Sequence, residues 1–193
     1  MNVFITGATG FIGSNLINKL ESHNFKILAL ARNNNQSIKK KNITWIYKGL
    51  KELKLIDFKN IEVVIHLAAT GVSPKKVSII ELEEINVKES LRLIKLSNEA
   101  GVKRIIVTGT CLEYGEEANK WKKIPPDASL RPLCDYSKSK AKSFKLLFDF
   151  ACKNKIELFY GRIFSAYGDG QYKKNFWPSL KEAAISGNDF PMT

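Results

Sequence analysis

A glycine turn close to the N-terminus constrains the fold of this chain more than any other feature. The apolar run Val3-Phe-Ile-Thr6 breaks into Gly7-Ala-Thr-Gly10-Phe-Ile-Gly13, with three glycines at three-residue spacing. A strand that turns sharply into a helix needs residues without a Cβ, and the same gap lets a phosphate approach the backbone. The free N–H groups of the first helical turn favour a pyrophosphate there. The pattern predicts a dinucleotide site, with a merely structural turn as the alternative.

Strand-like and helix-like segments alternate along most of the chain. The strand candidates are residues 2–6, 25–31, 43–47, 63–67, 104–108 and 156–160, and the long helix candidates are residues 80–100 and 135–153. The run 63–67 is too apolar to have one face in water, as expected in the middle of a parallel sheet. This order predicts an α/β fold with a doubly wound parallel sheet, the Rossmann fold, over residues 1–170.

The charge and cysteine content argue against other classes of protein. Lys and Arg number 31 against 19 Asp and Glu, a net charge of +12 that suits anionic partners such as phosphorylated cofactors. The lysines are spread along the chain rather than gathered in one stripe, so we expect no nucleic-acid partner. Cys111, Cys134 and Cys152 have neither Cys-x-x-Cys spacing nor nearby histidines. We therefore expect no metal site and no disulfide framework.

The apolar runs and the start of the sequence bear on where the protein is located in the cell. No apolar run approaches the roughly 20 residues of a membrane span. The first strand candidate begins at the second residue, without a charged leader, an apolar core and a cleavage site before it. We therefore expect a cytoplasmic protein without a membrane partner.

The end of the second strand candidate bears on the choice of cofactor. An acidic residue there bonds the ribose 2′-hydroxyl of NAD, whereas a basic residue accommodates the 2′-phosphate of NADP. The position is occupied by Ala31 and followed by Arg32. Arg32 favours NADP over NAD, with a solvent-exposed loop arginine as the alternative.

Tyr136 and Lys140, in the run Tyr-Ser-Lys-Ser-Lys, fall on one face of a helix candidate. The ammonium of Lys140 can lower the pKa of the Tyr136 phenol there and make it a usable acid or base near neutral pH. A solvated helix face in a Lys-rich chain is the alternative. Together with the glycine turn, the pair indicates a nicotinamide enzyme.

In this combination the residues resemble the extended short-chain dehydrogenase/reductase superfamily, in particular its NAD-dependent epimerase/dehydratase branch, which modifies nucleotide sugars. The motifs that carry the resemblance lie in order along the chain: Gly7-Ala-Thr-Gly-Phe-Ile-Gly13, His66-Leu-Ala-Ala69, Asn86-Val87, Thr108-Gly-Thr-Cys-Leu-Glu-Tyr-Gly115, Tyr136-Ser-Lys-Ser-Lys140 and Arg162-Ile-Phe-Ser-Ala-Tyr-Gly168. The resemblance makes His66 a structural residue and no metal ligand. Together with Arg32, the cofactor contacts expected are Gly7, Gly10, Phe11, Ile12, Gly13, Leu67, Ala68, Ala69, Lys140, Ile163 and Phe164.

The resemblance also implies catalytic roles for three residues. Thr110 would hydrogen-bond the reacting sugar oxygen, and Tyr136 would exchange the proton on that oxygen. Lys140 would bind the nicotinamide ribose and hold down the pKa of Tyr136. The family's 4,6-dehydratases carry an Asp-Glu pair directly after the threonine, whereas this chain has Cys111-Leu112, which disfavours dehydration. The side chain of Glu113 is expected to point away from that pair's location.

The activity implied is that of an NAD(P)-dependent nucleotide-sugar epimerase or 4-keto-sugar reductase, as in surface-polysaccharide synthesis. A non-catalytic NAD(P)-binding regulator that senses redox state is the alternative. Ser165 stands where many relatives carry an Asn that touches the substrate, which leaves the sugar unassigned. Because the chain is short for this family, we expect residues 171–193 to be only the beginning of a truncated substrate-binding domain. The helices at 80–100 and 135–153 resemble those that form a homodimer contact in the family.

Overall fold

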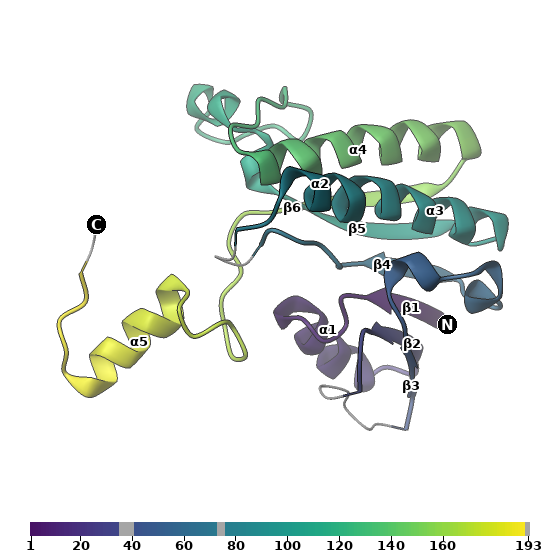
Figure 1. Ribbon diagram of the computed structural model, residues 1–193, viewed down its shortest axis with the longest axis horizontal. Coiled ribbons are helices and arrows are strands. Elements are labelled where there is room, and N and C mark those ends of the chain that lie inside the picture. Colours follow the sequence, from purple (N-terminus) through teal and green to yellow (C-terminus); the bar gives the residue numbers. More distant parts are fainter. Residues whose placement is uncertain (35–40, 73–75, 192–193) are drawn as a thin grey trace.

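The computed structural model describes residues 1–34, 41–72 and 76–191, and a six-stranded parallel sheet organises most of them (Figure 1). The strand order is β3-β2-β1-β4-β5-β6, so the direction of winding reverses between β1 and β4. This is the predicted doubly wound order, and ligands bind at such a switch point in open α/β sheets. The strands are β1 Asn2–Thr6, β2 Lys26–Ala31, β3 Ile43–Tyr47, β4 Val63–His66, β5 Arg104–Thr110 and β6 Glu157–Ile163.

Helices cover both faces of the sheet. Figure 1 shows α1 on one side and the group of α2, α3 and α4 on the other. The longer helices are α1 Phe11–Glu21, α3 Ser90–Glu99, α4 Asp135–Asn154 and α5 Phe176–Ser186. The shorter helical segments are η1 Leu50–Glu52, η2 Leu55–Phe58, α2 Ile79–Leu82, η3 Glu83–Glu89, η4 Cys111–Glu113 and η5 Glu116–Lys120.

The two faces of β1 show why its middle residues, 3–5, are apolar. Side chains alternate along a strand. Val3 and Ile5 therefore join the cluster that includes Ile17 of α1, whereas Phe4 joins the cluster on the opposite face. There the ring of Phe4 packs against Phe58 of η2 at 4.9 Å between centroids. A strand with both faces covered favours apolar side chains on both of them.

The helix expected at 80–100 has an irregular middle. Helical structure runs from Ile79 to Glu99, but η3 is π-helical rather than α-helical. A π-turn contains one residue more than an α-turn, and such turns are frequent at functional sites. The altered phase buries Asn86, whose side-chain oxygen accepts a hydrogen bond from the backbone N–H of Thr70 at 2.9 Å. The apolar period alone did not predict this, because it does not register one inserted residue.

The helix α4 begins at Asp135, one residue before the Tyr136–Lys140 motif. Its N-terminus is fixed by Ser137, whose hydroxyl accepts from the backbone N–H of Cys134 at 3.2 Å. Its end is a left-handed cap at Lys155, with φ of 55°. The observed bounds agree with the helix predicted at 135–153, and the motif lies in the first two turns.

The helix α5 stands away from the sheet (Figure 1), and Ala183 is its one buried residue. Within the described residues, helices lack the combination of length and apolar character needed to cross a bilayer. The division into a domain over 1–170 and the beginning of a second over 171–193 stays a prediction.

Candidate dinucleotide and catalytic site

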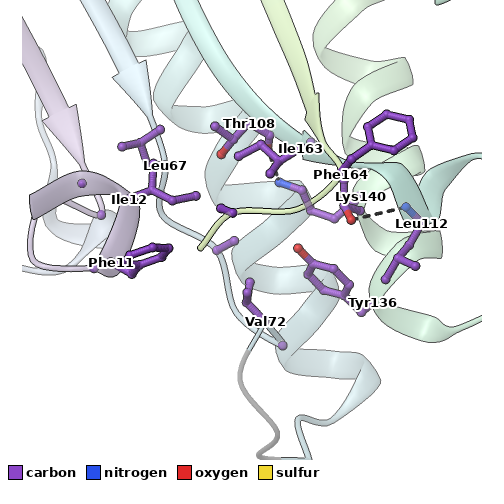
Figure 2. Close-up of a pocket in the computed structure, with 18 of the residues that line it drawn as sticks. Phe11, Ile12, Leu67, Val72, Thr108, Leu112, Tyr136, Lys140, Ile163 and Phe164 are labelled. Atoms are coloured by element: carbon purple, nitrogen blue, oxygen red, sulfur yellow. Dashed lines mark hydrogen bonds between the residues drawn. The ribbon is translucent and has the colours of Figure 1, made fainter. Parts of the chain in front are cut away.

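A cavity of about 500 Å³ lies at the carboxyl edge of the sheet, next to the switch point between β1 and β4 (Figure 2). Most of the residues predicted for the site meet there, although they come from five separate motifs. Those that line the cavity are Gly7, Gly10, Phe11, Ile12, Gly13, Leu67, Ala69, Thr110, Tyr136, Lys140, Ile163 and Phe164.

Two of the predicted cofactor contacts lie outside the lining. Ala68 is held against the turn below the cavity, where its backbone N–H donates to the hydroxyl of Thr6 at 3.2 Å. A Cβ added to Gly7 would lie 2.7 Å from that same nitrogen, which shows how closely the two segments pack. Arg32 is exposed just beyond the end of β2 and does not line the cavity.

The glycine turn has the geometry that its sequence predicts. Gly7 has φ of +68°, a left-handed conformation that side chains disfavour. A Cβ on Gly13 would lie 2.1 Å from the carbonyl oxygen of Gly7, so only glycine allows α1 to pack this closely. The first turn of α1 begins at Gly10 and has no side-chain cap. Its N–H groups thus need an outside acceptor, and a pyrophosphate is suited to that role.

A chain of buried hydrogen bonds lies beneath the cavity and is centred on His66. Its Nδ1 is 2.7 Å from the Thr6 hydroxyl, and its Nε2 is 2.8 Å from the Ser90 hydroxyl. Because Ala68 donates to Thr6 at one end and Ser90 donates to the Ile85 carbonyl at the other, a consistent arrangement has Nδ1 accepting and Nε2 donating. Burial, helped by the positive charge of Lys140, lowers the pKa of His66 to about 3. His66 is a structural residue, as expected.

Tyr136 and Lys140 point into the cavity from the same helix (Figure 2). The ammonium of Lys140 donates to the carbonyl oxygen of Thr108 at 2.7 Å, and burial lowers its pKa to about 8. Burial raises the pKa of Tyr136 to about 12, with a smaller contribution from the negative charge of Glu113. The expectation that Lys140 lowers the pKa of Tyr136 is therefore wrong for the protein alone. Removal of the phenol from water outweighs a lysine that is itself buried and bound to a carbonyl.

Thr110 is the last residue of β5 and is 9% exposed. Its hydroxyl accepts from the backbone N–H of Leu112 at 3.3 Å (Figure 2, dashed line), which starts the short helix η4. An accepting hydroxyl still has its own hydrogen to donate, and here it can donate to an oxygen in the cavity.

Sequence reasoning missed the network behind Thr110. Glu113 is fully buried, and its carboxylate accepts from Arg162 Nε at 2.9 Å and from the Tyr160 hydroxyl at 3.0 Å. The guanidinium of Arg162 also lies over the rings of Phe144 and Tyr114, at 4.3 and 5.0 Å from their centroids. Glu113 and Arg162 are both in motifs quoted above, but nothing in the sequence indicated that they pair.

The segment after β6 completes the cavity wall with Gln171, another residue that the sequence did not indicate. Its Nε2 donates to the Ala166 carbonyl at 3.2 Å, which fixes the orientation of the amide. Its Oε1 is buried and has no hydrogen-bond partner in the described part of the chain. An acceptor of this kind suits a nucleotide, whose ribose hydroxyls are donors. The segment is tied to α1, because Asn15 Nδ2 donates to the Asp169 carbonyl at 3.2 Å.

The site contains no cluster of metal-binding side chains among the residues described: no group of three or more His, Cys, Asp or Glu could hold an ion there. Cys111 lies instead beside the candidate catalytic residues, with its Sγ 3.7 Å from the Phe164 carbonyl oxygen. Among the groups that this chain presents to the cavity are a phenol, an amine and a hydroxyl, those of Tyr136, Lys140 and Thr110.

The chain matches known proteins over nearly its whole length. A model of the NAD dependent epimerase/dehydratase family matches residues 3–193. UDP-glucuronic acid decarboxylase 6 of Arabidopsis thaliana is 29% identical over 195 residues, covering 91% of this chain and 55% of the plant protein. UDP-glucuronic acid decarboxylase 3 of the same plant is 30% identical over 195 residues, covering 91% and 56%. The chain thus spans about half the length of these curated relatives.

Solved structures show the same architecture. MoeE5 in complex with UDP-glucose and NAD has a TM-score of 0.82 and 32% identity, over 97% of this chain and 62% of that one. UDP-N-acetylglucosamine 4-epimerase from Methanobrevibacter ruminantium M1, in complex with UDP-N-acetylmuramic acid, has a TM-score of 0.86 and 24% identity, over 97% and 64%. At its lower identity the second likeness bears on the fold alone. The predicted Rossmann fold is confirmed.

Proposed function

The chain belongs to the NAD dependent epimerase/dehydratase family, and from that premise we propose that it acts as an NAD(P)-dependent nucleotide-sugar epimerase or 4-keto-sugar reductase. One observation carries the proposal. The uncapped glycine turn and the side chains of Thr110, Tyr136 and Lys140 line a single cavity. A dinucleotide site and a proton-transfer site are thus next to one another, as hydride chemistry requires.

If a dinucleotide binds in the cavity, different parts of the wall would contact different parts of it. The N–H groups in the first turn of α1 would hold the pyrophosphate. Lys140 would bind the nicotinamide ribose, and Ile163 and Phe164 would border the nicotinamide end. When bound, the nicotinamide would supply the hydride donor or acceptor, which no side chain of the protein can replace.

The proton would be handled by Tyr136 at its hydroxyl oxygen. With a pKa of about 12, the phenol is protonated at neutral pH, so it is ready to protonate a keto oxygen as that oxygen is reduced. In the oxidative direction Tyr136 must act as the phenolate, which needs a positive charge beside it. The ammonium of Lys140 would provide that charge, while the hydroxyl of Thr110 would orient the sugar oxygen.

The substrate class rests on the relatives. The curated relatives are named for UDP-sugars, and MoeE5 was solved with UDP-glucose. We propose a UDP-sugar or a close nucleotide-sugar analogue for this chain. Cys111 and Leu112 follow Thr110 in place of an acidic pair, which disfavours dehydration. A cytoplasmic location and a homodimer through α3 and α4 remain predictions.

The cofactor is proposed to be NAD or NADP. MoeE5 was solved with NAD, which supports NAD. Arg32 follows β2, where a 2′-phosphate would lie, and supports NADP. Its position outside the cavity lining is compatible with either, because the adenosine end of the cofactor would lie beyond the glycine turn.

The experiment compares wild type with Tyr136→Phe in two assays. The first titrates the chain with NAD, NADP and their reduced forms, and the second follows conversion of UDP-sugars in the presence of each cofactor. We expect Tyr136→Phe to lose at least 100-fold in turnover, the usual contribution of a general acid, and to keep its cofactor affinity within about threefold. Tyr172→Phe is the matched control, because Tyr172 is exposed and outside the cavity lining.

Each outcome has a separate meaning. An unchanged rate in Tyr136→Phe would contradict the assignment of the proton donor. Cofactor binding by wild type without conversion of any nucleotide sugar would favour the alternative, a non-catalytic regulator. The joint presence of Thr110, Tyr136 and Lys140 in one cavity argues against that alternative, since a sensor needs none of these groups.

A further inference from the structure

Glu113 is a buried carboxylate that stands behind the candidate catalytic residues rather than among them. It is fully buried, does not line the cavity, and forms an ion pair with Arg162, which is 9% exposed at its side chain. Burying two charges costs free energy even when they pair, and an apolar pair of the same volume is often as stable. A contribution to stability alone is therefore a weak explanation for this pair.

The contacts of Glu113 lead toward Thr110. Its Oε1 accepts from the backbone N–H of Thr110 at 2.8 Å. The same oxygen accepts from the hydroxyl of Tyr160 at 3.0 Å. A backbone N–H bonded to a charged oxygen is held more firmly than one bonded to a neutral acceptor. The end of β5 is thereby fixed at the residue whose hydroxyl faces the cavity.

The contacts of Tyr160 lead toward Lys140. Its hydroxyl lies 3.3 Å from the carbonyl oxygen of Lys140, so one phenol of β6 contacts both Glu113 and the backbone of α4. The ring packs directly on β5, because a Cβ added to Gly109 would lie 2.2 Å from Tyr160 Cε1. Three consecutive residues of β5 are therefore engaged: Thr108 by the Lys140 ammonium, Gly109 by the Tyr160 ring and Thr110 by Glu113.

We propose that Glu113 and Tyr160 form a brace that sets the separation between the Thr110 hydroxyl and the Lys140 ammonium, which makes both of them positioning residues. Neither side chain lines the cavity, so neither is a catalytic residue. Through a phenol of β6, the brace links β5 and α4, the two elements that carry Thr110, Tyr136 and Lys140. Arg162 holds the carboxylate in place and is itself held by the surrounding rings. The inference rests on the proposed function, because it takes Thr110 and Lys140 as the groups that act on ligands.

Tyr160→Phe tests the brace, and Tyr114→Phe is its matched control. Both changes remove a hydroxyl from a ring that lies over the Arg162 guanidinium. The Tyr114 hydroxyl contacts Arg162 and the Pro126 carbonyl, each at 3.5 Å, and not the backbone of Thr110 or Lys140. A difference between the two variants therefore reports on the brace rather than on the packing around Arg162.

We expect Tyr160→Phe to weaken NAD binding about 3- to 10-fold, the range set by one lost hydrogen bond, because Lys140 is less firmly placed. We expect kcat on a UDP-sugar to fall by about 10-fold, while KM for that sugar stays within about twofold. Tyr114→Phe is expected to match wild type in both assays. Equal behaviour of the two variants, at equal urea midpoints, would overturn the proposal.

Glu113→Gln provides a second readout. The charge of Glu113 raises the pKa of both Tyr136 and Lys140, so its removal is expected to shift the alkaline limb of the kcat profile to lower pH. A purely structural defect would lower kcat without moving that limb, and this result would count against the brace. If Glu113→Gln does not fold, the tyrosine pair decides alone. Failure of the proposed function is distinct, since wild type would then convert no nucleotide sugar, whether or not it binds a dinucleotide.

Discussion

The C-terminal arm, which we define as residues 164–191, differs from the sheet body, the described residues before it, in how far its large apolar side chains are buried. In the body, Phe4, Phe58 and Leu147 are completely buried between the sheet and its helices. In the arm, Tyr167 is 67% exposed and Trp177 is 50% exposed, and these two rings pack against one another at 5.3 Å between centroids. The body buries a core of large apolar side chains, whereas α5 in the arm buries only Ala183.

The difference distinguishes the buried side chains that stabilise the fold from the exposed apolar side chains that could bind another surface. Apolar burial is the main favourable term in folding, so the free energy of unfolding should come almost wholly from the body. Gathered apolar surface that stays exposed usually marks a site of interaction. The expectation that residues 171–193 begin a substrate-binding domain agrees with such a surface and stays a prediction. Four changes test the contrast.

The largest effect is expected from Phe58→Ala in the body. The Phe58 ring is fully buried and packs against Phe4, so its removal leaves a cavity that the sheet cannot close. Truncations of this type cost about 3–5 kcal/mol in the free energy of unfolding. Urea denaturation followed by circular dichroism measures the loss. A loss below about 1 kcal/mol would mean that the body does not depend on this cluster.

The sequence predicted those parts of the fold that local sequence pattern determines. The strands at 2–6 and 43–47 were placed at their observed bounds, because local apolar pattern and flanking polar residues decide them. The last two strands are longer than predicted: β5 continues to Thr110 and β6 to Ile163. Glycine weakens a strand on local grounds, yet Thr108 pairs with Gly161 and Gly109 with Arg162. Pairing across the sheet overrides that local preference.

In the candidate site, too, the residues of local motifs were predicted and the contacts between distant residues were not. Gly7, Tyr136 and Lys140 were found because each motif is local in sequence. The brace of Glu113 and Tyr160 was not, because its partners are 47 residues apart and meet only in the folded sheet. The pKa of Tyr136 was predicted in the wrong direction for a related reason. Helix spacing shows that a lysine is near, but not how deeply the phenol is buried.

The second largest effect concerns acid and the buried His66. Its pKa is near 6.5 in the unfolded chain and about 3 in the folded one, so only the unfolded state gains a proton between these values. The contribution to stability is complete above pH 6.5 and is lost as the pH falls toward 3. The loss amounts to about 2–3 kcal/mol at pH 4.5. Urea midpoints measured from pH 7 to 4.5 test this.

His66→Gln is the control for that measurement. The variant should be less stable than wild type at pH 7, because Thr6 and Ser90 lose a matched partner. Its midpoint should fall less steeply with acid, since no imidazole remains to take up the proton. Parallel slopes in the two proteins would show that other groups govern acid unfolding.

A third and smaller effect is expected at Lys140, where the cavity wall of the body would hold the cofactor. Its pKa is about 8, so the ammonium loses its charge between pH 7 and pH 9. If the charged form binds the dinucleotide, affinity for NAD should fall up to about 10-fold over that window. Lys140→Arg keeps its charge throughout and should show no such decline, whatever its affinity at pH 7. A flat wild-type profile would remove Lys140 from the charge-dependent part of binding.

The smallest effect is expected from Trp177→Ala in the arm, which makes it the natural partner of Phe58→Ala. Each change deletes one aromatic side chain, but half of Trp177 is already in water and its ring contacts are with Tyr167 and Phe176. The free energy of unfolding should change by less than about 1 kcal/mol, with the urea midpoint of the body unmoved. A loss comparable to that of Phe58→Ala would show that the arm unfolds together with the sheet. The rings would then stabilise the body, and their exposure could not be taken as the mark of a separate surface.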